Sequence, residues 1–207
     1  MAKRKLDEST ILSQENTVIN NINFPNNNLE YYNPYNCDSI KIFNNRIIFH
    51  ATITEWSIEK LFEFIKIIVN SSTFDRINNR IYIHIISKGG ILQALYNFIN
   101  IKNTQFSNIE FISVIENSCT DAGFLLAALC NYRIIKKNVI CYMSKINIDS
   151  WYWGMFYQGD NSLEKFEYII SNIIFKVSKD KLLKYTNENN IWNAKKMIKI
   201  GFMDEII

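Results

Sequence analysis

Apolar residues follow two different periods along the chain, and the pattern becomes regular from Ser39 onward. Short runs rich in isoleucine and other β-branched or aromatic residues have the length and composition of β-strands. They predict strands at Arg46–His50, Arg80–Ile86, Ile109–Ile115 and Asn138–Met143. The run Arg80–Ile86 is apolar almost throughout, which is typical of a parallel strand covered on both faces.

The segments between these strands carry apolar residues at the i, i+3, i+4 spacing of an amphipathic helix. The first helix follows Thr54, whose hydroxyl can cap it, and has Glu55 in its first turn. The second follows the turn Ser87–Gly90, and the third is Asp121–Cys130. Strands that alternate with helices predict right-handed βαβ units, and therefore an α/β fold with a mostly parallel sheet flanked by helices.

Both ends of the chain differ from this middle part. Residues 1–38 are polar and rich in asparagine, and we interpret them as an arm that is partly disordered or docked on a neighbour. A single domain is expected at 39–207, with a helical part after residue 160 that lasts until the final few residues.

Composition narrows the class of protein. No apolar stretch approaches the roughly 20 residues of a membrane-spanning helix, and no apolar segment of a secretory signal follows the start. We therefore expect an intracellular protein, cytoplasmic or, if viral, in the virion. The net charge of +3 is too small to indicate nucleic-acid binding. Lys3, Arg4 and Lys5 are expected to be a solvated terminus, with nuclear targeting or phosphate contact as the alternatives.

The cysteines and histidines do not form a metal-binding pattern. No two of the four cysteines have CxxC spacing, and neither His50 nor His84 lies near a cysteine pair. We expect reduced, mostly buried thiols, no metal and no cofactor. The cysteines are Cys37, Cys119, Cys130 and Cys141.

Three motifs occur in a characteristic order. A strand ends in Ser87-Lys-Gly-Gly90, a second strand and tight turn precede Gly123-Phe-Leu-Leu-Ala-Ala128, and the chain ends near Gly201-Phe-Met-Asp204. From Ser39 to Ile207 this order and spacing resemble the proteolytic subunit of Clp protease, in the Clp/crotonase superfamily. The ClpP-like resemblance implies ββα repeats of the Clp/crotonase type and a ring-forming oligomer.

The resemblance also implies a serine peptidase and the positions of its catalytic groups. The nucleophilic serine falls on Thr120, the histidine on Ser144 and the aspartate on Asn189. A hydroxyl is a weak nucleophile until a base takes its proton, and neither Ser144 nor Asn189 can fill the role of its counterpart. We therefore expect a pseudoprotease subunit with a structural, regulatory or assembly role.

The same resemblance places Gly89, Gly90 and Asp121 at the remnant of an oxyanion hole and peptide groove. Backbone N–H groups at such a turn can stabilise a developing negative charge. The two glycines have an equally good structural explanation, because a tight strand-to-helix turn needs them.

Two other functions stay open at this point. An active peptidase could use a rearranged site, either a Cys119–His84 pair or Thr120 with Lys145 as its base. A crotonase-like acyl-CoA enzyme could use Glu116 as its acid or base.

An aromatic cluster lies where the family has the element that joins two rings. It can be an interface core or can pack on the domain's own helices. Expected partners are a second copy or a paralogous subunit; docking to an AAA+ unfoldase is less expected, since the Asn-rich arm replaces the family's axial loops. The cluster comprises Trp151, Tyr152, Trp153, Phe156 and Tyr157.

Overall fold

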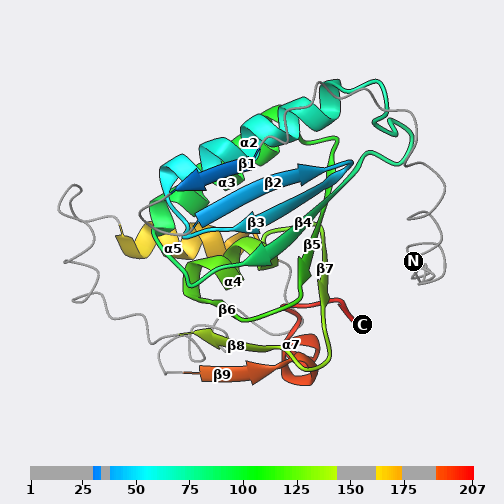
Figure 1. Ribbon diagram of the computed structural model, residues 1–207. Helices are drawn as coiled ribbons and strands as arrows, with labels where there is room; N and C mark the ends of the chain where they lie inside the picture. The colour runs from blue at the N-terminus through cyan, green and yellow to red at the C-terminus, as the bar shows by residue number, and fades with distance from the viewer. Residues whose placement is uncertain (1–29, 34–37, 144–161, 174–189) are drawn as a thin grey trace.

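A seven-stranded mixed sheet forms the centre of the protein (Figure 1). The computed structural model describes residues 30–33, 38–143, 162–173 and 190–207. The sheet order is β1-β2-β3-β4-β5-β7-β10, with antiparallel pairing only between β1 and β2 and between β2 and β3. Its strands are β1 (Glu30–Asn33), β2 (Asp38–Phe43), β3 (Arg46–His50), β4 (Arg80–Ile86), β5 (Glu110–Ile115), β7 (Tyr132–Ile135) and β10 (Glu205–Ile206).

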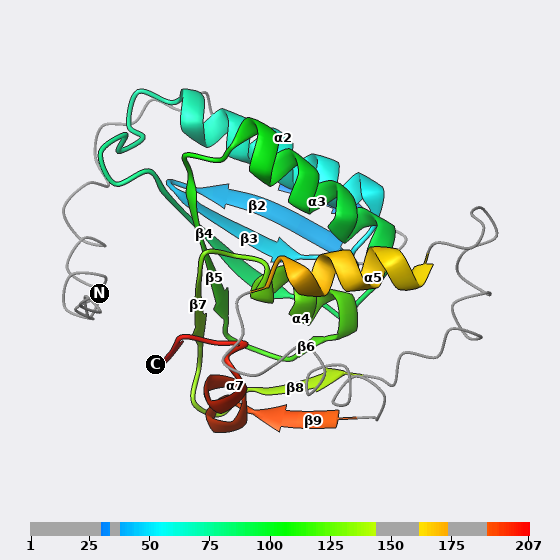
Figure 2. The same ribbon diagram turned by 180° about the vertical axis from the view of Figure 1, so that it is seen from behind.

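Four helices lie on one side of this sheet, as the two opposite views agree (Figures 1 and 2). We call this side the helix face and the other side the open face. Side chains on the helix face, such as Phe49 and Ile83, belong to the main hydrophobic core. The prediction of an α/β fold with a mostly parallel, helix-flanked sheet is confirmed. The helices are α2 (Glu55–Asn70), α3 (Leu92–Gln105), α4 (Asp121–Ala128) and α5 (Ser162–Ser171).

The expectation that Arg80–Ile86 is covered on both faces is wrong. Its side chains alternate between buried and half-buried positions along β4. Ile81, Ile83 and Ile85 face the helices and are fully buried, whereas His84 points to the open face. The open face of the strand carries Arg80, Tyr82, His84 and Ile86, and among the described elements no helix covers it.

A smaller sheet carries the rest of the strands. It has the order β6-β8-β9, with β6 (Cys119–Thr120) parallel to β8 (Ile140–Met143) and β9 (Asn190–Asn193) antiparallel to β8. Helix α7 (Ala194–Ile200) follows β9 directly. A helical part from residue 160 to the last few residues was therefore wrong at Asn190–Asn193, where pairing with β8 makes a strand.

Local sequence explains where the first helix begins. The Thr54 hydroxyl accepts a hydrogen bond from the Ser57 N–H at 3.1 Å, and the Thr54 N–H donates to the Ser57 hydroxyl at 2.9 Å. This reciprocal pair gives hydrogen-bond partners to two backbone N–H groups at the start of the helix. The predicted cap at Thr54 is confirmed, with Glu55 in the first turn.

The edge of the large sheet reaches into the segment that we interpreted as an arm. β1 pairs with β2 from Glu30↔Lys41 to Asn33↔Asp38. The division at residue 38 stays a prediction, because most of residues 1–38 lie outside the described part of the chain. No described helix is long and apolar enough to cross a membrane.

Candidate functional site

Two turns meet where β4 and β6 end, and together they form the candidate site. Ser87 bridges to Cys119, and the Thr120 N–H donates to the Ser87 carbonyl at 2.9 Å. On the other side, the Gly90 segment bridges to Ile53, with the Ile53 N–H donating to the Gly89 carbonyl at 2.8 Å. Backbone pairing therefore holds the Ser87–Gly90 turn between the β3–α2 connection and the start of α4.

Both glycines of this turn are structurally required. Gly89 has φ +101° and Gly90 has φ +144°, in a region that residues with a side chain rarely adopt. A Cβ on Gly90 would also lie 2.1 Å from the Ile53 carbonyl oxygen. The structural explanation for the Gly-Gly pair is sufficient on its own, and an oxyanion role would be additional.

A left-handed residue forms the corner between β6 and α4. Thr120 is extended and half-buried, and it precedes the helix without capping it through its side chain. Asp121 has φ +47°, a conformation that aspartate tolerates better than most residues. Its Cβ would lie 3.1 Å from a Cβ placed on Gly89. The structure thus brings together Gly89, Thr120 and Asp121.

Helix α4 approaches the turn closely because it has no side chain at Gly123. A Cβ at that position would lie 2.4 Å from the Ser87 Cβ and 2.7 Å from the Ser87 hydroxyl oxygen. The Gly-Phe-Leu-Leu-Ala-Ala motif therefore has a role in packing. The absence of a side chain at Gly123 lets α4 lie against Ser87, just past the end of β4, and Phe124 is fully buried.

The counterparts of the catalytic histidine and aspartate, Ser144 and Asn189, lie outside the described residues. So does Lys145. The register of the small sheet constrains only their neighbours: Thr120 pairs with Tyr142, and Met143 pairs with Asn190. Met143, the residue before Ser144, therefore lies on the strand that pairs with Thr120, and Asn190, the residue after Asn189, lies beside it.

Cys119 and His84 are not brought together. Cys119 is fully buried, and burial raises the pKa of its thiol well above the ordinary value. Ser113 donates to the Ala127 carbonyl of α4 and so lies on the helix face. Its neighbour Val114 is the register partner of His84, which places His84 on the opposite, open face. A Cys119–His84 nucleophile pair does not fit this geometry.

His84 instead belongs to a polar cluster at the end of the sheet. Its Nδ1 lies 3.4 Å from a Glu116 carboxylate oxygen, which is also 3.5 Å from Lys136 Nζ. Burial is the largest effect on the pKa of His84 and lowers it, although Glu116 pulls in the other direction. Glu116 also borders a surface pocket of about 600 Å³ that includes Lys137. A crotonase-like acid–base role for Glu116 gains no support from these contacts.

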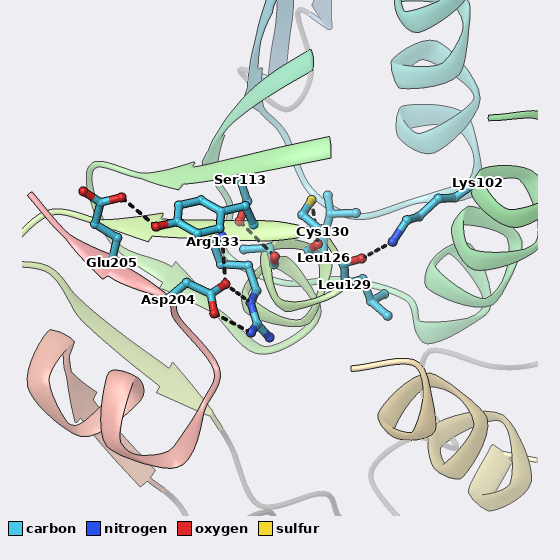
Figure 3. Close-up of polar contacts among 10 residues, drawn as sticks. Lys102, Ser113, Leu126, Leu129, Cys130, Arg133, Asp204 and Glu205 are labelled. Atoms are coloured by element: carbon cyan, nitrogen blue, oxygen red, sulfur yellow. Dashed lines mark hydrogen bonds and ion pairs between the residues drawn. The ribbon is translucent and has the colours of Figure 1, made fainter. Parts of the chain in front are cut away.

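The final motif has a clear structural role (Figure 3). Gly201 ends α7 in a left-handed conformation with φ +89°. Phe202 packs on Phe124 with ring centroids 4.6 Å apart, and Asp204 pairs with Arg133 at 2.8 Å. These contacts fasten the C-terminal segment to β7 and to the helix that carries the candidate site.

Sequence patterns alone did not identify two of the charged residues that support this region. Arg133 is almost fully buried in a strand that the periodicity missed, and Lys102 Nζ donates to the Leu129 carbonyl at 2.7 Å, just past the end of α4 (Figure 3). Burial lowers the pKa of Lys102. Since both partners come from distant elements, no local pattern could have paired them.

Comparison with known proteins does not assign a family. No protein-family model matches the chain, and no curated protein is significantly similar to it. Within the described ranges, no group of three or more histidine, cysteine, aspartate or glutamate residues could hold a metal ion. The aromatic interface candidates Trp151, Tyr152, Trp153, Phe156 and Tyr157 lie outside those ranges.

Proposed function

We propose that this chain is a Clp-protease-like pseudoprotease subunit, which keeps the scaffold of a nucleophile turn and acts in assembly or regulation. One observation carries the proposal. Thr120 occupies the corner between β6 and α4 beside the Gly89 turn, while both described histidines belong to the open face of the large sheet. The scaffold at the corner is therefore retained without an imidazole from either histidine of the chain.

The chemistry of the corner supports the same conclusion. A threonine hydroxyl needs an adjacent base before it can attack a carbonyl carbon. The nearest thiol in sequence, Cys119, is buried and protonated at neutral pH, so it supplies neither a base nor a nucleophile. Members of a catalytic triad act as a unit, and loss of the base alone removes most of the roughly 10⁶-fold contribution to kcat.

A labelling experiment tests the proposal. The purified full chain is incubated with a fluorescent fluorophosphonate and, separately, with short fluorogenic peptides, beside an active serine peptidase as the positive control. We expect no labelling and no hydrolysis above that of a Thr120→Ala variant. Stoichiometric labelling that disappears in Thr120→Ala would overturn the proposal and would indicate a rearranged peptidase site.

A calorimetric titration distinguishes the remaining alternative. Acetyl-CoA is titrated into the wild-type chain and into Glu116→Gln, since a crotonase-like enzyme would bind the thioester near its carboxylate. We expect no heat of binding in either case. Saturable binding that is weakened in Glu116→Gln would favour the acyl-CoA enzyme over the pseudoprotease.

A further inference from the structure

Large apolar side chains are exposed at two opposite ends of the molecule. Within the described ranges, four of them are more than half exposed: Ile77 at 93%, Ile191 at 71%, Phe43 at 61% and Ile140 at 56%. Ile77 and Phe43 lie at the end where the parallel strands β3 and β4 begin, whereas the other two belong to the small sheet. Figures 1 and 2 both show the loop after α2 at one end and β8, β9 and α7 at the other. Apolar contact surface is therefore accessible at both ends.

At the first end, a hydrogen-bonded turn presents Ile77. The Asp75 carboxylate accepts the backbone N–H groups of Ile77 at 2.9 Å and of Asn78 at 3.2 Å, and also the Asn78 side-chain amide. The Asn79 N–H donates to the Asp75 carbonyl at 2.8 Å, and the neighbouring Phe74 is buried. We call residues Asp75–Asn79 the Ile77 turn. Because its backbone is already ordered, a partner that buries Ile77 avoids much of the entropic cost of binding a loop.

At the other end, the pocket of about 600 Å³ can receive an apolar side chain. Its apolar lining consists of Val139 and Ile140, where β8 begins, and Ile207, just after β10. Ile191 lies on the same face of the small sheet as Ile140, because it pairs with Tyr142, two residues farther along β8. Ile191 therefore adds a second exposed apolar side chain to the face that carries Ile140. We call this cavity the Ile140 pocket.

Opposite charges accompany the two ends. The Asp75 carboxylate binds only neutral N–H groups, and no cation of the described residues lies within ion-pair distance of it. At the pocket, Lys137 has no carboxylate partner in the described part of the chain. Arg76, next to Asp75, has its counterpart in Glu116, the carboxylate of the pocket, which Lys136 approaches only to 3.5 Å. Each charge of the Ile77 turn thus has an opposite charge at the pocket.

We propose that the Ile77 turn of one copy inserts into the Ile140 pocket of a second copy, so that the chains associate head to tail. The two surfaces differ, so the contact is heterologous and repeats until a ring closes or a filament grows. A two-fold contact lacks this complementarity. Pocket against pocket would bring the Lys137 side chains of both copies together, and turn against turn offers no pocket.

This inference rests on the assembly role proposed above and names the surfaces that would carry it. Its test measures association and does not depend on the reactivity of Thr120. An inert chain that stays monomeric would overturn the inference alone, whereas a reactive chain that associates head to tail would overturn the pseudoprotease alone.

Arginine substitutions at the two ends test the contact. Sedimentation velocity is measured on the full chain from about 1 µM to about 1 mM, the range of moderate to weak complexes. We expect the 24.4 kDa chain to associate, and Ile77→Arg and Ile140→Arg each to weaken association at least tenfold. Ile48→Arg, in the middle of β3 at 40% exposure, is the control and should leave association unchanged. A wild-type monomer throughout the series, or equal effects of all three variants, would overturn the proposal.

Mixing the two end variants tests the head-to-tail arrangement. In the mixture, one contact is intact, namely the unaltered turn of Ile140→Arg in the unaltered pocket of Ile77→Arg. We therefore expect a complex that stops at one copy of each variant, whereas each variant alone stays monomeric. A chain that carries both substitutions is the control and should bind neither itself nor the wild type. Absence of the one-to-one complex, with both variants folded by circular dichroism, would overturn the proposal.

A double-mutant cycle tests the charge pairing. Asp75→Asn keeps an acceptor oxygen for the turn but removes the charge, and Lys137→Gln removes the opposite charge. Each is expected to weaken association about threefold, as for an exposed ion pair. The double variant should also lose only about threefold, because the pair is already broken in either single variant. Multiplied losses of about ninefold would overturn the pairing of Asp75 with Lys137 and thus this register of the contact.

Discussion

The carboxylate of Asp204 accepts two hydrogen bonds from the guanidinium of Arg133 in a bidentate contact, with Nε–Oδ2 at 2.8 Å and Nη2–Oδ1 at 3.1 Å. The same Oδ2 accepts the Arg133 backbone N–H at 3.1 Å. Arg133 is 4% exposed, so the ion pair with Asp204 offsets part of the cost of burying its charge. The pair links β7 to the segment just before β10, two elements that are 71 residues apart in sequence.

Replacing Asp204 with asparagine is expected to destabilise the fold strongly. The substitution removes the carboxylate that holds the buried guanidinium in a bidentate contact, which costs about 3 kcal/mol at a site of this burial. Urea denaturation of Asp204→Asn and the wild type measures the loss. Glu63→Gln is the control, because it removes an exposed i, i+3 pair with Lys60 and should cost at most about 0.5 kcal/mol. Equal losses in the two variants would contradict the role given to Arg133.

Gly123→Ala is expected to destabilise the corner by about 2 kcal/mol, because its new methyl group would overlap the Ser87 side chain. Ser87→Gly removes that side chain, so the double variant should lose less than the sum of the single losses. Denaturant unfolding of all four proteins gives the coupling free energy. Ser107→Gly, an exposed serine, should show no coupling to Gly123→Ala. Additive losses at Ser87 and Gly123 would mean that the helix can shift away from the strand.

Elements that are determined by their own residues could be predicted from the sequence. Elements that form only through tertiary pairing could not. The helix cap at Thr54 was predicted correctly, and the strand Arg80–Ile86 was predicted with its observed bounds, because a cap and a β-branched run are local features. β9 was missed because its four residues become a strand only by pairing with β8.

The candidate site divides in the same way. The Gly89–Gly90 turn and the Thr120 corner could be predicted, since each has its own short motif. The position of His84 on the open face could not, because it depends on the register of β4 against β5. The buried Arg133–Asp204 pair could not be predicted either, because it depends on the pairing of β10 with β7, which brings together residues 71 positions apart.

His84 should make the fold less stable in mild acid. Burial lowers its pKa below the ordinary value of 6.5, so the folded protein holds it neutral while the unfolded chain takes up a proton. As the pH falls below 6.5, proton uptake therefore favours unfolding. Urea denaturation across this range should show a steeper loss in the wild type than in His84→Gln. His50→Gln, altered at an exposed histidine, should follow the wild type; a parallel course of all three proteins would contradict this account.

The buried thiols should be inert in the native protein. Burial raises the pKa of Cys130 to about 11 and that of Cys141 to about 12, and raises that of Cys119 as well. The thiolate is the reactive form. A Cys37→Ser variant should therefore react with an aromatic disulfide reagent at neutral pH only as fast as local or global unfolding exposes the three remaining thiols. Denaturant should release three reactive thiols. Rapid labelling of one thiol in the folded variant, lost in Cys119→Ala, would show that the corner holds a nucleophilic cysteine after all.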